Sequence, residues 1–372
     1  DKKIMIKNIL IRNVLKCQLM ILVGIFVALA GLMTYGLVYA VALEPMDNNG
    51  LINNKLGDNR ETKPESGIKI INGEAVGDNE KNLWPVAVVI DNHPDARPTF
   101  GLNKASLVYE FPVEGGATRF LAFYTPGQEM INKVEKIGPV RSVRPYFLMA
   151  VKEYDALLAH AGGSAEALKD IEKLRINNLE EIAWWGPEYF WRVYSMETPH
   201  NLFTSTDKLT QAVVDWKLKD KISSYQSWLF NRDLNNNYRL DLAEQITINF
   251  SADKNYQATW QYATSTADYT RRQNGKIYLD GLDNKVVKAD DIIIQFVKEE
   301  KILDATGRLA IQLTGEGEVW LFRDGVKIIG RWRKGSAEGR TIFYDQSGGE
   351  LLLKPGKIWV EVVPGAREVK FQ

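Results

Sequence analysis

The stretch WPVAVVIDNHP, residues 84–94, decides the fold of the first globular segment. Five apolar residues follow Pro85 and lead into the polar turn Asp91-Asn92-His93-Pro94. A short, continuous apolar run that ends in turn residues is typical of a buried strand. Such a strand delivers polar side chains at its C-terminal end. We therefore expect Asp91 and His93 at the C-terminal end of a buried strand.

The segments that follow alternate between strand and helix patterns. Residues 105–113 and 118–125 read as two further strands. Apolar residues recur at helical spacing over 145–160, and Ser164 and Ser205 (or Thr206) are N-cap candidates for two more helices. Strands that alternate with helices predict an α/β domain, which we place at residues 83–228.

The sequence pattern changes after a polar stretch at residues 231–237. From there, many short strand-like runs follow one another closely, and Asp324-Gly325 between two of them is a hairpin signal. Residues 240–372 are predicted to form a smaller, mostly β domain, either a sandwich or a barrel.

The N-terminal region predicts an export or anchor segment. Residues 19–43 carry no charge and follow a basic tail, residues 1–18. About 20 apolar helical residues span a bilayer, and basic flanks stay in the cytoplasm. We expect a single-pass transmembrane helix with the rest of the chain extracytoplasmic. Because Ala40-Val41-Ala42 fits signal peptidase, a cleaved signal segment is the alternative; a buried soluble helix is the third.

The polar residues 44–82 are too poor in apolar side chains to form a core, so we predict a disordered linker. Cys17 precedes the apolar run, whereas a lipid-modified cysteine follows a shorter apolar run, so we do not expect Cys17 to carry a lipid. Because it is the only cysteine, the chain has no internal disulfide. The 47 basic and 47 acidic residues argue against a general nucleic-acid binder.

Three histidines and several arginines in polar turns are the candidates for chemistry. Histidine can act as a base or ligate a metal, or it can simply hold a loop together. Arginines near a helix start can hold an anion, or they can pair with neighbouring carboxylates. The catalytic candidates are Asp91, His93, Glu110, Glu114, His160 and His200. The anion-binding candidates are Arg97, Arg119, Arg141 and Arg144.

The turn that carries Arg141 and the turn at His160–Ser164 both lead into helices, so we expect them to face Asp91 at one sheet edge. Trp184, Trp185 and Trp191 flank a Gly-Pro pair and can stack on a sugar or partner, or pack in a core. No dinucleotide fingerprint or P-loop is present. No metal-ligand set or cofactor is predicted, although a divalent cation at Asp91 is possible.

Four stretches together resemble the YerB-like family of bacterial envelope proteins. They are residues 85–124, KIGPVRSVRPYF at 136–147, YDALLAHAGGS at 154–164 and TPHNLFTS at 198–205. The resemblance covers nearly everything after Trp84. It implies an export segment, a linker, an α/β domain and a smaller C-terminal domain, but no activity. Many members are lipoproteins, and this chain departs from them because it has no lipobox. A weaker likeness in layout alone is to the LytR–CpsA–Psr ligases, which attach phosphate-linked glycopolymers to peptidoglycan.

Three functional hypotheses follow. The first is a membrane-anchored, non-catalytic module that binds a cell-wall glycopolymer or an envelope protein, with an anion site in the α/β domain. The second is an enzyme that acts on phosphate-linked envelope glycans. The third is a peptidoglycan hydrolase with Glu110 or Glu114 as the acid.

Overall fold

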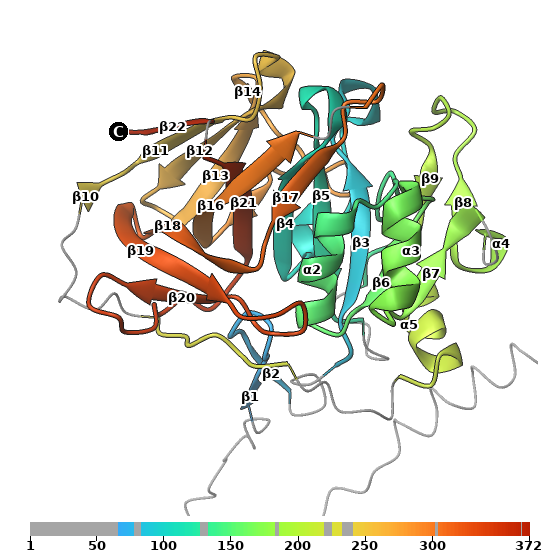
Figure 1. Ribbon diagram of the computed structural model, residues 1–372, viewed down its shortest axis with the longest axis horizontal. Helices are drawn as coiled ribbons and strands as arrows, with labels where there is room; N and C mark the ends of the chain where they lie inside the picture. Colours follow the sequence, from blue (N-terminus) through green and yellow to red (C-terminus); the bar gives the residue numbers. More distant parts are fainter. Residues whose placement is uncertain are drawn as a thin grey trace, which may run out of the picture. The chain divides into compact units, whose positions relative to one another are not determined.

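Twelve strands drawn from both ends of the globular chain form one continuous sheet in this computed structural model (Figure 1). The structure describes residues 66–77, 83–126, 133–182, 186–218, 225–232, 241–301, 304–365 and 367–372. The sheet order is β10-β19-β18-β16-β21-β4-β5-β3-β6-β7, with β17 beside β16 and β20 beside β19.

The predicted strand after Trp84 is β3, Val86–Asp91, which is buried along its whole length. It pairs antiparallel with β5, Thr118–Tyr124, which in turn pairs with β4, Leu107–Pro112. On its other side it runs parallel to β6, Leu157–His160. Both faces of β3 are covered, which explains its unbroken apolar run.

The C-terminal half of the chain completes this sheet. Strand β21, Ile358–Pro364, runs parallel to β4 on one side and to β16, Asp291–Lys301, on the other. In Figure 1 the orange and dark red strands therefore continue the sheet of the teal ones. Asp324-Gly325 closes the predicted hairpin between β18 and β19. The remaining strands of the sheet are β7 (Asn178–Glu180), β10 (Asp241–Leu242), β17 (Leu309–Gln312), β18 (Gly315–Arg323), β19 (Val326–Lys334) and β20 (Ile342–Asp345).

A second sheet covers one face of the first. Its six strands are β11 (Gln245–Asn249), β12 (Gln257–Ala263), β13 (Asp268–Gln273), β14 (Lys276–Ile277), β15 (Lys288–Ala289) and β22 (Glu368–Phe371). Alternate residues of β3, such as Val88 and Ile90, share a core with Ile248 and Trp260 of this sheet. The intervening residues of β3 share the opposite core with the helix that begins at Pro145.

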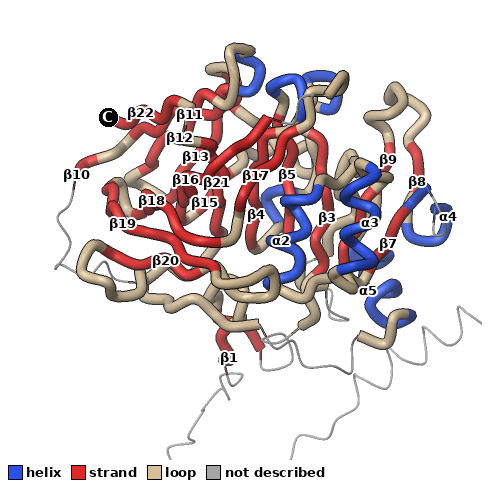
Figure 2. The backbone as a smooth tube through the Cα atoms, in the orientation of Figure 1, coloured by secondary structure: helices blue, strands red, loops and turns tan. Residues whose placement is uncertain are grey.

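The helices of the described residues lie around the β3–β7 part of the sheet (Figure 2). They are α2 (Pro145–Glu153), α3 (Ala165–Lys173), α4 (Gly186–Tyr189) and α5 (Thr206–Asp215). Ser164 and Ser205 cap α3 and α5 as expected, each accepting a backbone N–H. Two small hairpins complete the fold: β1 (Ser66–Ile68) with β2 (Ala75–Gly77), and β8 (Trp191–Arg192) with β9 (Leu202–Phe203).

The predicted fold class, an α/β domain followed by a smaller β domain, is wrong. Most of the regular structure is strand, and residues 62–372 cluster as one unit in which both halves share a sheet. Between β3, β4 and β5 the chain turns through loops and single 3₁₀ turns instead of helices. The long helix expected over 145–160 ends at Glu153, because Asp155 adopts a left-handed backbone (φ 48°) and residues 157–160 pair with β3.

Part of the predicted linker is ordered, since residues 66–77 form the hairpin β1–β2 with Ile71 fully buried. The basic tail and the segment 19–43 lie outside the described residues. In the part of the chain that the structure describes, we find no helix long and apolar enough to cross a membrane.

Candidate functional site

Three polar turns meet where β3 ends. The backbone N–H of Arg141 donates to the carbonyl of Val89 in β3 (2.9 Å), and the N–H of Asp91 donates to Pro139 (2.9 Å). The turn after β6 joins them, because the N–H of Ala161 donates to the carbonyl of Arg141 (3.1 Å). The structure thus places the three turns singled out in the sequence side by side at one sheet edge.

Asp91 is the centre of this edge and is almost completely buried. Its Oδ2 accepts a hydrogen bond from Nδ1 of His200 (2.7 Å) and lies 2.9 Å from Nε of Arg141. Its Oδ1 accepts the backbone N–H of His93 (3.0 Å). One carboxylate therefore orients two histidines and an arginine. We call Asp91, His93, Arg119, Arg141 and His200 the Asp91 cluster.

The contact between Asp91 and Arg141 is an ion pair and not a straight hydrogen bond. The buried Nε of Arg141 has no hydrogen-bond acceptor within the described residues, despite its short distance to the carboxylate. A buried donor without an acceptor costs about 1–3 kcal/mol. A ligand oxygen at this point would remove that cost.

The two histidines of the cluster stack on each other. Their ring centroids are 4.9 Å apart with an interplanar angle of 13°. The 3₁₀ turn η2, Pro94–Ala96, brings Asp95 to the same place, and one ligand atom each of His93, Asp95 and His200 lies within 4.8 Å of the other two. These three residues could hold a metal ion. We did not single out Asp95 from the sequence, although its place two residues after His93 was a usable signal.

Arg119 within the Asp91 cluster and Arg144 beside it add positive charge. Burial and the neighbouring cations Arg144 and Arg141 lower the pKa of Arg119 to about 10, against the opposing effect of Asp91. Arg119 donates to the carbonyl of Ser142 (2.7 Å). Arg144 is held by Glu114 through two contacts from Nε (2.7 and 2.9 Å), and this pairing outweighs burial and lowers the pKa of Glu114.

Two of the predicted site residues make contacts that join distant parts of the chain. Glu110 is fully buried, and its carboxylate pairs with Arg271 of β13 (2.7 Å). Arg97 donates to the carbonyls of Asn92 (2.7 Å) and Asn255 (2.8 Å), so it ties the end of β3 to the second sheet. The sequence could not indicate these two long-range partners, because Asn255 and Arg271 each lie more than 150 residues away in the chain.

His160 is likewise a structural histidine. It is fully buried at the end of β6, with Nδ1 2.8 Å from the carbonyl of Gly162 and Nε2 2.7 Å from Oδ1 of Asn178. Burial lowers its pKa. Both ring nitrogens are thus engaged, and the side chain does not join the Asp91 cluster.

The structure describes one of the three tryptophans that were predicted to stack on a ligand. Trp184 and Trp185 lie outside the described residues, so their predicted stacking role stays a prediction. Trp191 lies in β8, partly buried, with its ring 6.4 Å from that of Phe203. That contact fits packing within the small β8–β9 hairpin.

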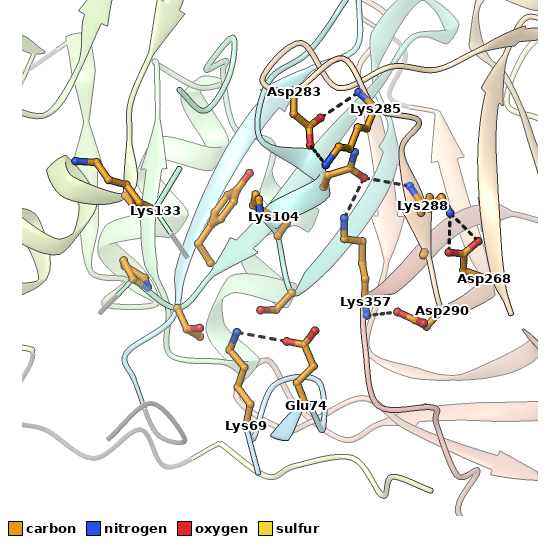
Figure 3. A pocket seen from close by; sticks show the side chains of 18 of the residues that line it. Lys69, Glu74, Lys104, Lys133, Asp268, Asp283, Lys285, Lys288, Asp290 and Lys357 are labelled. Atoms are coloured by element: carbon orange, nitrogen blue, oxygen red, sulfur yellow. Dashed lines mark hydrogen bonds and ion pairs between the residues drawn. The ribbon is translucent and has the colours of Figure 1, made fainter. Parts of the chain in front are cut away.

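A pocket of about 790 Å³ lies elsewhere, lined by residues of both halves of the chain (Figure 3). Most of its charges are paired within the protein, as in Lys69–Glu74 and Lys288–Asp268. Lys357 differs: its Nζ donates to the carbonyl of Leu102 (2.8 Å), and burial lowers its pKa to about 7. The pocket therefore offers a ligand fewer free charges than its composition suggests.

Comparison with known proteins identifies the family of this chain. Models described as "Protein of unknown function (DUF3048)" match residues 71–219 with their N-terminal domain and 246–360 with their C-terminal domain. The chain belongs to this family. The predicted resemblance to YerB-like proteins is confirmed, because the chain is 33% identical over 288 residues to the "Putative lipoprotein YerB" of Bacillus subtilis (strain 168). The match covers 75% of this chain and 81% of that protein.

A solved structure agrees with this assignment. The crystal structure of YerB from Bacillus subtilis matches with a TM-score of 0.70 at 29% identity, covering 82% of this chain and 99% of that one. The two family models divide the chain near our predicted boundary between 228 and 240, while the shared sheet joins the two parts. The exact domain limits stay a prediction.

Proposed function

We propose that this chain is an extracytoplasmic envelope protein that binds phosphate groups of a cell-wall glycopolymer at the Asp91 cluster. The observation that carries the proposal is the buried Nε of Arg141, which has no acceptor within the described part of the chain. An oxyanion is the natural partner for such a donor, because hydrogen bonds between ionised groups are about twice as strong as neutral ones.

Three guanidinium groups at one edge support an anionic ligand. Arg119, Arg141 and Arg144 bring three positive charges to this edge, and the neighbouring carboxylates of Asp91, Asp95 and Glu114 bring three negative ones. These charges balance before either histidine is counted, so the argument rests on geometry, because a planar guanidinium can hold two oxygens of one phosphate.

The envelope location rests on two features. The relative from Bacillus subtilis is named a putative lipoprotein, which describes a protein attached to a membrane by lipid. In this chain the uncharged residues 19–43 would serve the same end, either as an anchor or as an export signal.

The test is a binding measurement with the full chain, purified in mild detergent, and poly(glycerol phosphate) as the probe. Replacing two charged donors in Arg119→Gln/Arg141→Gln should weaken binding at least 10-fold, since each hydrogen bond to a charged group contributes about 1.5–3 kcal/mol. Arg331→Gln, an exposed arginine of β19 outside the cluster, is the matched control and should bind as the wild type does. Equal affinity of the wild type and the double variant would refute the proposal, as would equal affinity for an uncharged glycan.

A second candidate function is an enzyme that acts on phosphate-linked envelope glycans. The favouring observation is the hydrogen bond between Asp91 and Nδ1 of His200 (2.7 Å), which fixes the ring so that Nε2 can accept a proton. Release of phosphomonoester ends from poly(glycerol phosphate), followed by ³¹P NMR and absent in His200→Gln, would support it. Unchanged polymer after prolonged incubation would reject it and leave binding as the function.

A further inference from the structure

One atom of His93, in the Asp91 cluster, and one of the neighbouring Asp95 already lie at the separation that one metal ion imposes on its ligands. Nδ1 of His93 is 3.4 Å from Oδ2 of Asp95. Metal–ligand bonds of about 2.0–2.2 Å at tetrahedral angles place neighbouring ligand atoms about 3.3–3.5 Å apart. The remaining contact of His93 Nδ1, from the backbone N–H of Asp95, is long at 3.3 Å. An ion could replace it at little cost.

The third ligand needs only a small adjustment. A ligand atom of His200 lies within 4.8 Å of those of His93 and Asp95, so closure to a tetrahedral edge requires movements of about 1–1.5 Å. His93 and Asp95 can supply this movement, because their side chains are 45% and 72% exposed. The side chain of His200 is only 13% exposed, so His200 is the fixed ligand.

Asp91 supplies the support that metal-bound histidines usually have. Metal-ligating histidines nearly always donate their second ring N–H to a carboxylate or carbonyl, which fixes the tautomer and orients the ring. Asp91 accepts Nδ1–H of His200 with Oδ2 and holds the backbone of His93 with Oδ1. The arrangement leaves Nε2 of His200 as the nitrogen that can ligate.

From this geometry we propose that His93, Asp95 and His200 bind a divalent transition-metal ion, with Zn²⁺ as the best match, and that Asp91 is the positioning residue of the site. Two imidazoles and one carboxylate form a three-residue ligand set that leaves a fourth position open. The stacked rings of His93 and His200, with centroids 4.9 Å apart, keep both imidazoles within reach of one ion.

The open position gives the ion a place in ligand binding. The guanidinium of Arg141, whose buried Nε pairs with the same Asp91 without a well-aligned hydrogen bond, lies beside the site. A phosphate oxygen could then bind the ion while a second oxygen accepts from the guanidinium. This part of the inference rests on the proposed function, whereas metal binding itself does not.

The test is a Zn²⁺ titration of the full chain, without a histidine tag, in competition with a chromogenic chelator. We expect one equivalent of Zn²⁺ per chain. His93→Ala, at an exposed position that leaves the fold intact, should weaken binding at least 100-fold. Asp91→Asn should weaken it about 10–100-fold, the effect usual for loss of a residue that supports a ligand. Asp253→Ala removes an equally exposed carboxylate next to a 3₁₀ turn and should have no effect.

The outcomes separate the two proposals. Absence of Zn²⁺ binding by folded wild-type protein, or equal binding by wild type and His93→Ala, would overturn the metal site. Such a result combined with arginine-dependent binding of poly(glycerol phosphate) in the presence of EDTA would leave the proposed function standing. Zn²⁺ bound as expected, without any affinity for the polymer, would overturn the proposed function and leave the metal site.

Discussion

Arg271 offers the sharpest test of how the two sheets hold together. It lies in β13 of the second sheet, and its fully buried guanidinium reaches Glu110 of β4 (2.7 Å) and Glu361 of β21 (3.2 Å). It also lies 4.9 Å from the ring centroid of Trp359. Burial and the neighbouring Glu110 raise the pKa of Glu361 well above its ordinary value, which favours its neutral form. The neutral form of Glu361 would leave the cation of Arg271 facing the single carboxylate of Glu110.

Arg271→Met removes the cation but keeps most of the volume. The carboxylate of Glu110 would be left buried without its partner, and breaking a buried pair in this way costs about 3–5 kcal/mol. That is a large part of the roughly 5–15 kcal/mol by which a domain is stable. Arg271→Met/Glu110→Gln removes the orphaned charge as well, so the double variant should recover at least 2 kcal/mol over the sum of the two single effects.

Urea unfolding of the full chain, followed by tryptophan fluorescence, measures these free energies. Arg272→Met is the matched control, because this neighbouring side chain is exposed and, among the residues that the structure describes, bonds only the carbonyl of Gly275. It should change stability by no more than about 0.5 kcal/mol. A loss below about 1 kcal/mol for Arg271→Met, or strictly additive effects in the double variant, would refute the charge-balance argument.

Two further predictions concern the same sheet. Burial raises the pKa of Asp291 in β16 to about 8, so the folded state holds an extra proton between about pH 4 and pH 8 and wild-type stability falls as pH rises through that window. The free energy of unfolding of Asp291→Asn, measured with urea, should therefore rise relative to that of the wild type by up to about 1.4 kcal/mol per pH unit. A difference between the two proteins that stays constant between about pH 5 and pH 8.5 would contradict this. A chain truncated after residue 228 lacks β21 and the partner of Glu110, so it should aggregate or fail to give a cooperative unfolding transition; a cooperative transition in this fragment would show that the first part folds alone.

The local elements could be predicted because the sequence carries their physical signals. The unbroken apolar run of β3 reflects burial on both faces, Ser164 caps α3, and Asp324-Gly325 forms a two-residue hairpin turn. Strand pairing leaves no such local signal. Nothing near Leu107 or Ile358 indicates that these residues align side by side in parallel strands, and this pairing merges the two expected domains into one sheet.

The residues of the candidate site also differ in how far the sequence could predict their positions. We expected Asp91 and Arg141 to lie together because strand ends and helix starts share an edge in open sheets. In the structure, backbone hydrogen bonds join the turns that carry these two residues. The sequence made Glu110 a catalytic candidate or the partner of an arginine, but it could not name that arginine. In the structure the partner is Arg271, which lies 161 residues later in the chain. His160 and His200 look alike in sequence, since each stands in a polar turn, but only one of them lies beside Asp91.

The rigidity of the Asp91 cluster differs from its base to its rim, and this difference bears on what it can do. At the base, Arg97 ties Asn92 to the second sheet, and Asn92 donates to Glu110 inside the buried ion cluster (3.2 Å), so the end of β3 cannot shift without breaking buried bonds. At the rim, His93 and Asp95 remain exposed. A site of this kind has a fixed carboxylate that sets orientation and adaptable ligands that close around an ion or a phosphate. The loss of orientation in Asp91→Asn should therefore weaken binding without reducing stability in proportion, whereas changes at Arg271 should do the reverse.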